Sequence, residues 1–261
     1  GWRRVRPGRY ASGDRKRAVG HKLWGVTTLL LVRHGLTDLT GSVLAGRTPG
    51  LSLSERGRGQ AEELAERLRE LALDAIVSSP LERCRETAAA VARGRDLRVA
   101  VDDRFGEVGY GEWTGRRLEE LAKEPLWRVV QAHPSAAVFP GGESIAAMQH
   151  RAVAAVRDWN ARLGEKAVYL VCSHGDVIKA IVADALGMHL DQFQRITADP
   201  ASLTVIRYTP LRPFVIRMND VGGEIRNIIP PESPNDGSVD QDGGENITES
   251  DAAVGGGAGT T

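Results

Sequence analysis

The sequence has little cysteine and no motif that would place it in several large classes of protein. Two cysteines in 261 residues are too few for a disulfide framework, and no C-x-x-C pair is present, so we expect a reducing, cytoplasmic location. No apolar run approaches the roughly 18–20 residues that span a bilayer, so no membrane partner is expected. The absence of a Gly-Lys dipeptide excludes a P-loop. A cysteine phosphatase needs an arginine six residues after its cysteine, and Ala90 and Ile178 stand there.

Charge is balanced overall but distributed unevenly along the chain. The formal net charge is zero. Residues 1–26 are strongly basic, whereas residues 227–261 contain acids and no Lys or Arg. The body between them is close to neutral, which argues against a nucleic-acid partner.

The same shifts in composition predict three regions. Residues 1–26 form a basic extension that we expect to be disordered and dispensable for folding. Residues 27–226 are predicted to form one domain. Residues 227–261 are acidic and rich in glycine, so they can bury little apolar area against their ordering entropy, and we expect a disordered tail.

Alternating strand and helix patterns run through the body of the chain. Residues 27–32 are apolar on both faces, which is typical of a buried parallel strand. Ser54 is predicted to cap a helix. Ser79 is predicted to cap another, with Pro80 at its first position. The remaining expected elements are strands at 74–78, 97–101, 167–172, 203–208 and 214–218 and helices at 145–163 and 177–186. This alternation predicts a three-layer α/β/α sandwich with a mainly parallel central sheet.

Two of the predicted strands end in the same way. One runs into Arg33-His34-Gly35 and the other into Ser173-His174-Gly175-Asp176. Ligands of open α/β sheets bind beyond the carboxyl ends of the strands, so the two histidines can converge on one ligand. The other histidines, His21, His133, His150 and His189, lack this context, and we expect them to be structural or exposed to solvent.

Two further segments carry candidate groups. Arg83 lies one turn into the helix after the strand at 74–78, where the helix N-terminus and a guanidinium both favour phosphate. Arg85 is expected to point elsewhere, since two helical residues are about 200° apart. Glu107 lies in a loop rich in glycine and aromatics, where a raised pKa would suit a general acid.

Taken together, these segments resemble the histidine phosphatase (phosphoglycerate mutase-like) superfamily. The matching pieces occur in family order over about residues 27–220: Arg33-His34-Gly35 with Thr37, the run Ser78 to Ala88, Glu107 with Gly111-Glu112-Trp113, Pro140 to Ser144, and Ser173-His174-Gly175. The resemblance is greatest to an actinobacterial branch of phosphomutases and broad-specificity phosphatases.

The resemblance implies a role for each matching residue. His34 would be the nucleophile and become phosphohistidine, and Glu107 would protonate the leaving group. Arg33, Arg83 and His174 would hold the phosphoryl oxygens. Neither a metal nor a cofactor is implied. The resemblance also suggests further contacts to the phosphate or the leaving group, from Thr37, Arg47 and Glu143. Asp176 is expected either to tune the site or to cap a helix.

The expected function is hydrolysis of phosphomonoesters of small metabolites, and the resemblance allows a homodimer. A 2,3-bisphosphoglycerate-dependent phosphoglycerate mutase is the nearest alternative. A metallohydrolase using His34, Glu107, His174 and Asp176 is a second, and a phosphoprotein-binding module a third. Thr40 and Gly109 stand where many members have Asn and Asp, so the substrate is left open.

Overall fold

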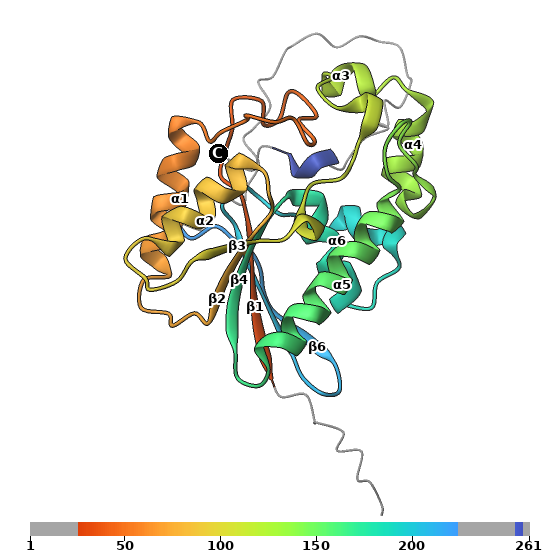
Figure 1. The fold of residues 1–261 in the computed structure, drawn as a ribbon. Coiled ribbons are helices and arrows are strands. Elements are labelled where there is room, and N and C mark those ends of the chain that lie inside the picture. Colours follow the sequence, from red (N-terminus) through yellow and green to blue (C-terminus); the bar gives the residue numbers. More distant parts are fainter. Residues whose placement is uncertain (1–25, 224–253, 258–261) are drawn as a thin grey trace, which may run out of the picture.

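The computed structural model describes residues 26–223 and 254–257 (Figure 1). The expectations for residues 1–25 and most of those for residues 227–261 lie outside the described residues. The strands are β1 (Thr27–Arg33), β2 (Ala75–Ser78), β3 (Val99–Val101), β4 (Val168–Ser173), β5 (Leu203–Tyr208) and β6 (Pro213–Asp220). The α-helices are α1 (Glu55–Arg67), α2 (Glu82–Ala92), α3 (Leu118–Leu121), α4 (Pro125–Ala132), α5 (Ile145–Leu163) and α6 (Gly175–Ala185).

The six strands form one mostly parallel sheet in the order β3-β2-β4-β1-β5-β6. Strands β3, β2, β4 and β1 are parallel, whereas β5 runs antiparallel to β1 and β6 antiparallel to β5. Helices α1 and α2 lie on one side of the sheet and α5 and α6 on the other (Figure 1). The predicted three-layer α/β/α architecture is therefore confirmed.

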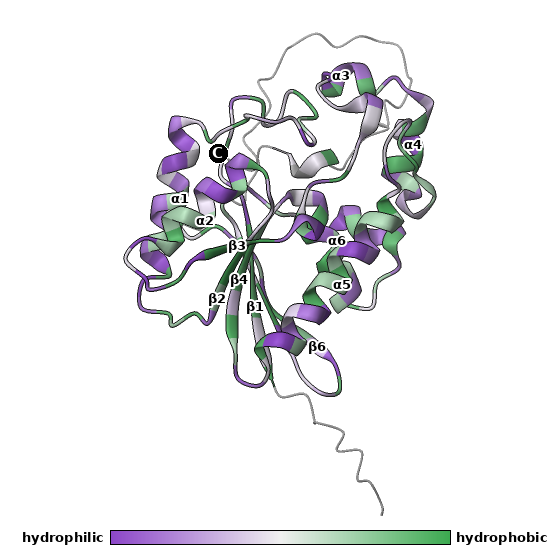
Figure 2. Ribbon diagram, in the orientation of Figure 1, coloured by the Kyte–Doolittle hydropathy of each residue, from purple (hydrophilic) through white to green (hydrophobic). Residues whose placement is uncertain are grey.

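Alternation along β1 explains why helices cover both faces of the sheet. Leu29 and Leu31 belong to the hydrophobic cluster that includes α5 and α6. Leu30 and Val32 belong to the cluster that includes α1 and α2. Because successive side chains of a strand point to opposite faces, an unbroken apolar run needs a cover on each side. Apolar residues accordingly follow the central strands in Figure 2.

The helix starts show one correct prediction and one error. Ser54 caps α1 as predicted, and its side chain accepts a hydrogen bond from the Gly57 amide. Ser79 does not cap α2: the helix begins at Glu82, and the extended Leu81 precedes it. The Ser79 hydroxyl instead lies 2.7 Å from Nε2 of His174. The side chain that was expected to cap the helix is therefore engaged by a residue from a distant strand end.

A short piece of the C-terminal tail, residues 254–257, belongs to the part of the chain that the structure describes. Residues Val254–Gly256 form a short 3₁₀ helix, and Val254 is 3% exposed within the same hydrophobic cluster as α6. Valine supplies apolar area in a tail that is otherwise short of it, and the expectation of disorder for the tail as a whole stays a prediction. This segment lies above the carboxyl ends of the strands (Figure 1).

No helix in the described ranges is long and apolar enough to cross a membrane.

Backbone contact between the loop after β1 and the start of α1 leaves no room for side chains. A Cβ atom at Gly57 would lie 2.0 Å from the Leu36 carbonyl oxygen, and one at Gly35 would lie 2.5 Å from the Gly57 carbonyl oxygen. The Leu36 carbonyl also accepts a hydrogen bond from the Ser54 amide. The segment that follows His34 is thus held in place by the first turn of α1.

We expect Gly57→Ala to lower the free energy of unfolding by about 1–3 kcal/mol, because backbone atoms must move to admit the methyl group. Gly59→Ala is the matched control in the same helix. A Cβ at Gly59 meets nothing within 4 Å. The free energy of unfolding of Gly59→Ala should therefore exceed that of the wild type by roughly 0.5–1 kcal/mol. Urea titrations of the two variants measure the difference. Equal stabilities would contradict the close backbone approach.

Candidate active site

The two strand-end histidines lie beside each other because β1 and β4 are neighbouring parallel strands. Arg33 is paired with Ser173 in the sheet register, and the next residue of each strand is a histidine. The amide of His34 donates to the Ser173 carbonyl at 3.0 Å. The two imidazole rings lie 5.2 Å apart between centroids, at 65° to each other. The predicted convergence of the two histidines is therefore present in the structure.

Hydrogen bonds determine which nitrogen of His34 is free to react. Nδ1 lies 2.7 Å from the Gly35 carbonyl oxygen, which can only accept, so Nδ1 carries the proton. Nε2 then holds a lone pair and accepts from Nε of Arg83 at 3.2 Å. Burial, followed by the charges of Arg83 and Arg33, lowers the pKa of His34 well below its usual value. The imidazole is therefore neutral and nucleophilic at neutral pH.

His174 is the opposite tautomer. Its Nδ1 lies 3.2 Å from Nη2 of Arg83, and a guanidinium can only donate, so the proton is on Nε2. That nitrogen lies 2.7 Å from the Ser79 hydroxyl and donates to it. Burial and the charge of Arg83 also lower the pKa of His174 well below its usual value.

Arg33 and Arg83 are both buried, each with about 2% of its surface exposed. Arg33 donates to the carbonyl oxygens of Ala198 at 2.8 Å and Gly255 at 3.4 Å. Arg83 donates to the Gly46 carbonyl at 2.7 Å. Its buried Nη1 has no hydrogen-bond partner among the residues that the structure describes. An unsatisfied buried donor is costly, and an anionic ligand would satisfy it. Arg85, by contrast, is exposed, as predicted.

Glu107 lines the same pocket as Arg33, His34 and Arg83. Its side chain is nearly buried, and Oε1 accepts from the Val108 amide at 2.9 Å. Oε2 lies 3.7 Å from Nδ1 of His174. Burial, reinforced by the charge of Asp176, raises the pKa of Glu107 to about 7. A substantial fraction of this carboxyl group is therefore protonated at neutral pH and able to donate a proton.

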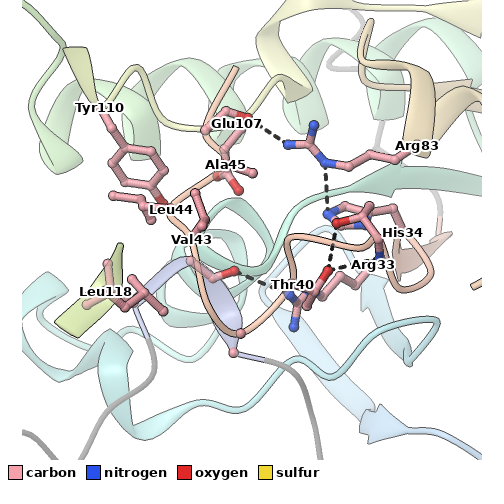
Figure 3. Close-up of a pocket in the computed structure, with 16 residues that line it drawn as sticks. Arg33, His34, Thr40, Val43, Leu44, Ala45, Arg83, Glu107, Tyr110 and Leu118 are labelled. Atoms are coloured by element: carbon pink, nitrogen blue, oxygen red, sulfur yellow. Dashed lines mark hydrogen bonds between the residues drawn. The ribbon is translucent and has the colours of Figure 1, made fainter. Parts of the chain in front are cut away.

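Four of these residues line one pocket (Figure 3), and His174 lies behind Arg83 outside the lining. Arg33, His34, Arg83 and Glu107 form its charged end, and Thr37 and Thr40 lie on its wall. The hydroxyls of Thr37 and Thr40 are 2.9 Å apart. The rest of the wall is formed by Gly41, Val43, Leu44, Ala45, Gly46, Tyr110, Leu118, Val254, Gly255 and Gly257.

Arg47 and Glu143, the other two expected substrate contacts, do not line this pocket. They form an ion pair of 2.8 Å with each other. Arg47 also donates to the Glu107 carbonyl at 2.7 Å, and Glu143 accepts from the Gly109 amide at 2.8 Å. Their observed partners are thus the backbone around Glu107, and substrate contact by either remains a prediction.

Asp176 lies in the first turn of α6 and does not cap it, since the capping position is His174. Its carboxylate is buried and forms an ion pair of 3.1 Å with Lys179. It also accepts from the Tyr110 hydroxyl at 2.8 Å and the Gly255 amide at 3.1 Å. Asp176 therefore joins the Glu107 loop, α6 and the C-terminal segment beneath the pocket.

Sequence reasoning missed Arg151 of α5, which binds the loop that carries Glu107. Its guanidinium donates to the carbonyls of Arg104 at 2.7 Å, Gly106 at 2.8 Å and Glu107 at 3.0 Å. It also forms an ion pair of 2.6 Å with Glu143. An arginine within a long amphipathic helix carries no local signal of such a role, because the three carbonyls that it binds lie 44 to 47 residues earlier in the chain.

We expect Arg151→Ala to reduce kcat/KM for alkyl phosphates at least tenfold, because the Glu107 loop loses several hydrogen bonds. The loosened loop would also admit water to Glu107, lower its pKa and move the alkaline limb of the pH profile to lower pH. Arg151→Lys should recover part of the loss. Arg157→Ala is the control on the same helix, since Arg157 is 71% exposed in its side chain. An unchanged pH profile in Arg151→Ala would contradict this positioning role.

The remaining predictions concern the other histidines and a possible set of metal ligands. His133, His150 and His189 are exposed, as predicted, and His21 lies outside the described residues. Within the described ranges, no group of three or more His, Cys, Asp or Glu side chains is arranged to hold a metal ion. The four residues considered for a metallohydrolase are therefore not grouped as ligands.

An α/β sheet that brings a histidine, two arginines and a protonatable carboxyl to one pocket, with a second histidine bonded to one of the arginines, defines an enzyme of phosphoryl transfer. Residues 29–221 match the model of the histidine phosphatase superfamily (branch 1), and the chain belongs to this family. The predicted family and its phosphatase class are thus confirmed.

Relatives of known name share most of the domain. Phosphoserine phosphatase 1 of Hydrogenobacter thermophilus is 34% identical over 197 residues, which cover 73% of this chain and 91% of that protein. Glucosyl-3-phosphoglycerate phosphatase of Mycolicibacterium vanbaalenii is 33% identical, with 64% and 78% covered. The solved structure of the mycobacterial glucosyl-3-phosphoglycerate phosphatase Rv2419c has a TM-score of 0.68 at 27% identity, covering 75% of this chain and 99% of that one.

Proposed function

We propose that this protein is a metal-independent phosphomonoesterase that acts on a small phosphorylated metabolite through a phosphohistidine on His34. The observation that carries the proposal is the unprotonated Nε2 of His34, which faces Arg83 in a pocket that Glu107 also lines. A lone pair, a cationic clamp and a protonated carboxyl are the three parts that phosphoryl transfer requires.

In the first step, Nε2 of His34 attacks phosphorus, so that a P–N bond forms while the ester P–O bond breaks. Glu107 gives its proton to the departing oxygen, and the alcohol leaves. Arg33 and Arg83 stabilise the charge on the phosphoryl oxygens. The incoming phosphate dianion also raises the pKa of His174, because a nearby negative charge favours the imidazolium. His174 can then donate to a phosphoryl oxygen.

In the second step, Glu107 is ionised and accepts a proton from a water molecule. The resulting oxygen nucleophile attacks phosphorus, the P–N bond breaks, and His34 returns to its neutral form with inorganic phosphate as the product. A single carboxyl group therefore serves first as acid and then as base. Its pKa of about 7 suits both duties near neutral pH.

The alternatives differ in the fate of the phosphoryl group or in their need for metal. A phosphoglycerate mutase would return the phosphoryl group to an alcohol and depend on 2,3-bisphosphoglycerate. Relatives include a probable phosphoglycerate mutase GpmB of Erwinia tasmaniensis, 30% identical over 177 residues. We favour the phosphatase because only 24 residues separate Gly115 from Pro140, whereas mutases of the family usually carry a longer insertion there.

Wild-type protein should hydrolyse p-nitrophenyl phosphate in excess EDTA, and His34→Ala should lose that activity by at least roughly a thousandfold because no P–N bond can form. His150→Ala is the control, since His150 is exposed and does not line the pocket. Turnover that EDTA abolishes and added metal restores would reject the phosphohistidine mechanism in favour of a metallohydrolase.

Glu107→Gln should slow hydrolysis of an alkyl phosphate by roughly 10²–10⁴-fold and affect p-nitrophenyl phosphate much less, since nitrophenolate leaves without help from an acid. In the wild type, kcat/KM for the alkyl ester should fall as pH rises through about 7, where Glu107 ionises. The acid limb should lie well below pH 6.5, because His34 stays neutral there. An alkaline limb retained by Glu107→Gln would assign it to another group.

We also propose a cytoplasmic location and a homodimer. Both cysteines are free and buried, which suits a reducing compartment. On β6, at the sheet edge, Phe214, Ile216 and Met218 are each nearly half exposed, and such an apolar edge supports association with a second copy. Sedimentation velocity at micromolar protein tests the dimer, and a monomer at these concentrations would contradict it.

A further inference from the structure

The pocket is divided into a charged end and an uncharged end. The Arg, His and Glu side chains that line it are Arg33, His34, Arg83 and Glu107, and we assign them to the phosphate-binding end. The side chains farther out are Val43, Leu44, Leu118 and Val254, together with the ring of Tyr110. Among the described residues, no lysine, arginine, aspartate or glutamate lines this outer part. Figure 3 shows Leu118 and Val43 on the side of the cavity away from Arg83.

The arginines nearest in sequence to these wall residues have carboxylate partners of their own. Arg47 forms an ion pair with Glu143 at 2.8 Å, Arg116 with Glu124 at 2.7 Å and Arg117 with Glu119 at 3.2 Å. None of the three lines the pocket. These three arginines are therefore already paired with carboxylates and do not form part of the outer wall.

The polar groups of the outer wall are hydroxyls. Thr37 and Thr40 lie 2.9 Å apart and bond each other, and Thr37 is 6% exposed. A hydroxyl pair can donate to or accept from one further hydroxyl group. It cannot neutralise a carboxylate. The Tyr110 hydroxyl is already committed to Asp176 at 2.8 Å.

We propose that the substrate's leaving group is an uncharged, largely apolar alcohol, with room for one hydroxyl beside Thr37 and Thr40. The inference rests on the proposed phosphatase function and narrows its substrate. A carboxylate placed against this wall would lose its water without gaining a cation, and an ion left unpaired in this way is strongly disfavoured. Phosphoserine and phosphoglycerate both carry such a carboxylate, so this chain differs in preference from relatives named for those substrates.

The C-terminal segment completes this uncharged wall. Val254 packs into the hydrophobic cluster with Leu44 and Tyr110. The Gly255 amide is bonded to Asp176 at 3.1 Å and its carbonyl to Arg33 at 3.4 Å. A Cβ at Gly255 would lie 3.2 Å from Leu44 Cδ1. Within the described residues 254–257, the leaving group therefore meets only valine and glycine.

A matched pair of esters tests the proposal on the wild-type protein. Propyl phosphate and 3-phosphonooxypropanoate have the same three-carbon chain and differ only in a terminal carboxylate. We expect kcat/KM for propyl phosphate to be at least tenfold higher at pH 7 and 0.15 M salt. Equal or higher kcat/KM for the carboxylated ester would overturn the proposal.

A charge introduced into the wall provides the second test. Leu118→Lys should shift the ratio of the two kcat/KM values toward the carboxylated ester by tenfold or more, because Leu118 lines the pocket. Leu211→Lys is the matched control: Leu211 is 86% exposed, at the turn between β5 and β6, and its ratio should equal that of the wild type. An unchanged ratio in folded Leu118→Lys would also count against the proposal.

Failure of this inference and failure of the proposed function give different results. If neither ester nor p-nitrophenyl phosphate is hydrolysed in EDTA, the phosphatase function itself is wrong. If p-nitrophenyl phosphate is hydrolysed through His34 and the carboxylated ester is preferred, the function stands and the uncharged leaving group is rejected. Because the ester pair is measured on the wild type, a folding defect in a variant would not affect the first test.

Discussion

Two guanidinium groups buried at the carboxyl ends of β1 and β2 impose the electrostatics of the whole site. Arg33 and Arg83 are each about 98% shielded from solvent, and positive charge is costly in such surroundings. Burial and these positive charges lower the pKa of both nearby imidazoles, so both histidines are neutral until phosphate binds. Burial, followed by the charge of Asp176, raises the pKa of Glu107, and the two arginines oppose that rise. The nucleophile, the phosphate affinity and the proton donor thus all depend on charges buried in one cluster.

The sequence predicts the elements whose signals are local. An apolar run followed by Arg33-His34-Gly35 identifies a buried strand and its end, and a second run does so for His174. The rule that ligands bind at the carboxyl ends of parallel strands then places the two histidines together, and they lie at neighbouring strand ends in the structure. Glu107 could be singled out because glycines and aromatics surround it in the chain.

Contacts between distant segments could not be predicted in the same way. Ser79 has the local pattern of a helix cap, but a hydrogen bond with His174, 95 residues away, takes its hydroxyl. Arg151 binds a loop 44 to 47 residues earlier. Gly255 lies 79 residues from Asp176, to which its amide donates. In each case the partner is selected by tertiary packing, which overrides local preference and composition.

The hydrogen bond from Nδ1 of His34 to the Gly35 carbonyl has a consequence for the intermediate itself. Because that nitrogen is already protonated and held at 2.7 Å, only Nε2 can accept the phosphoryl group. The enzyme would therefore accumulate the tele isomer of phosphohistidine and none of the pros isomer. Phosphoramidate bonds of this kind survive in alkali and break in acid, so only an alkaline quench would preserve the labelled protein for an isomer-specific antibody.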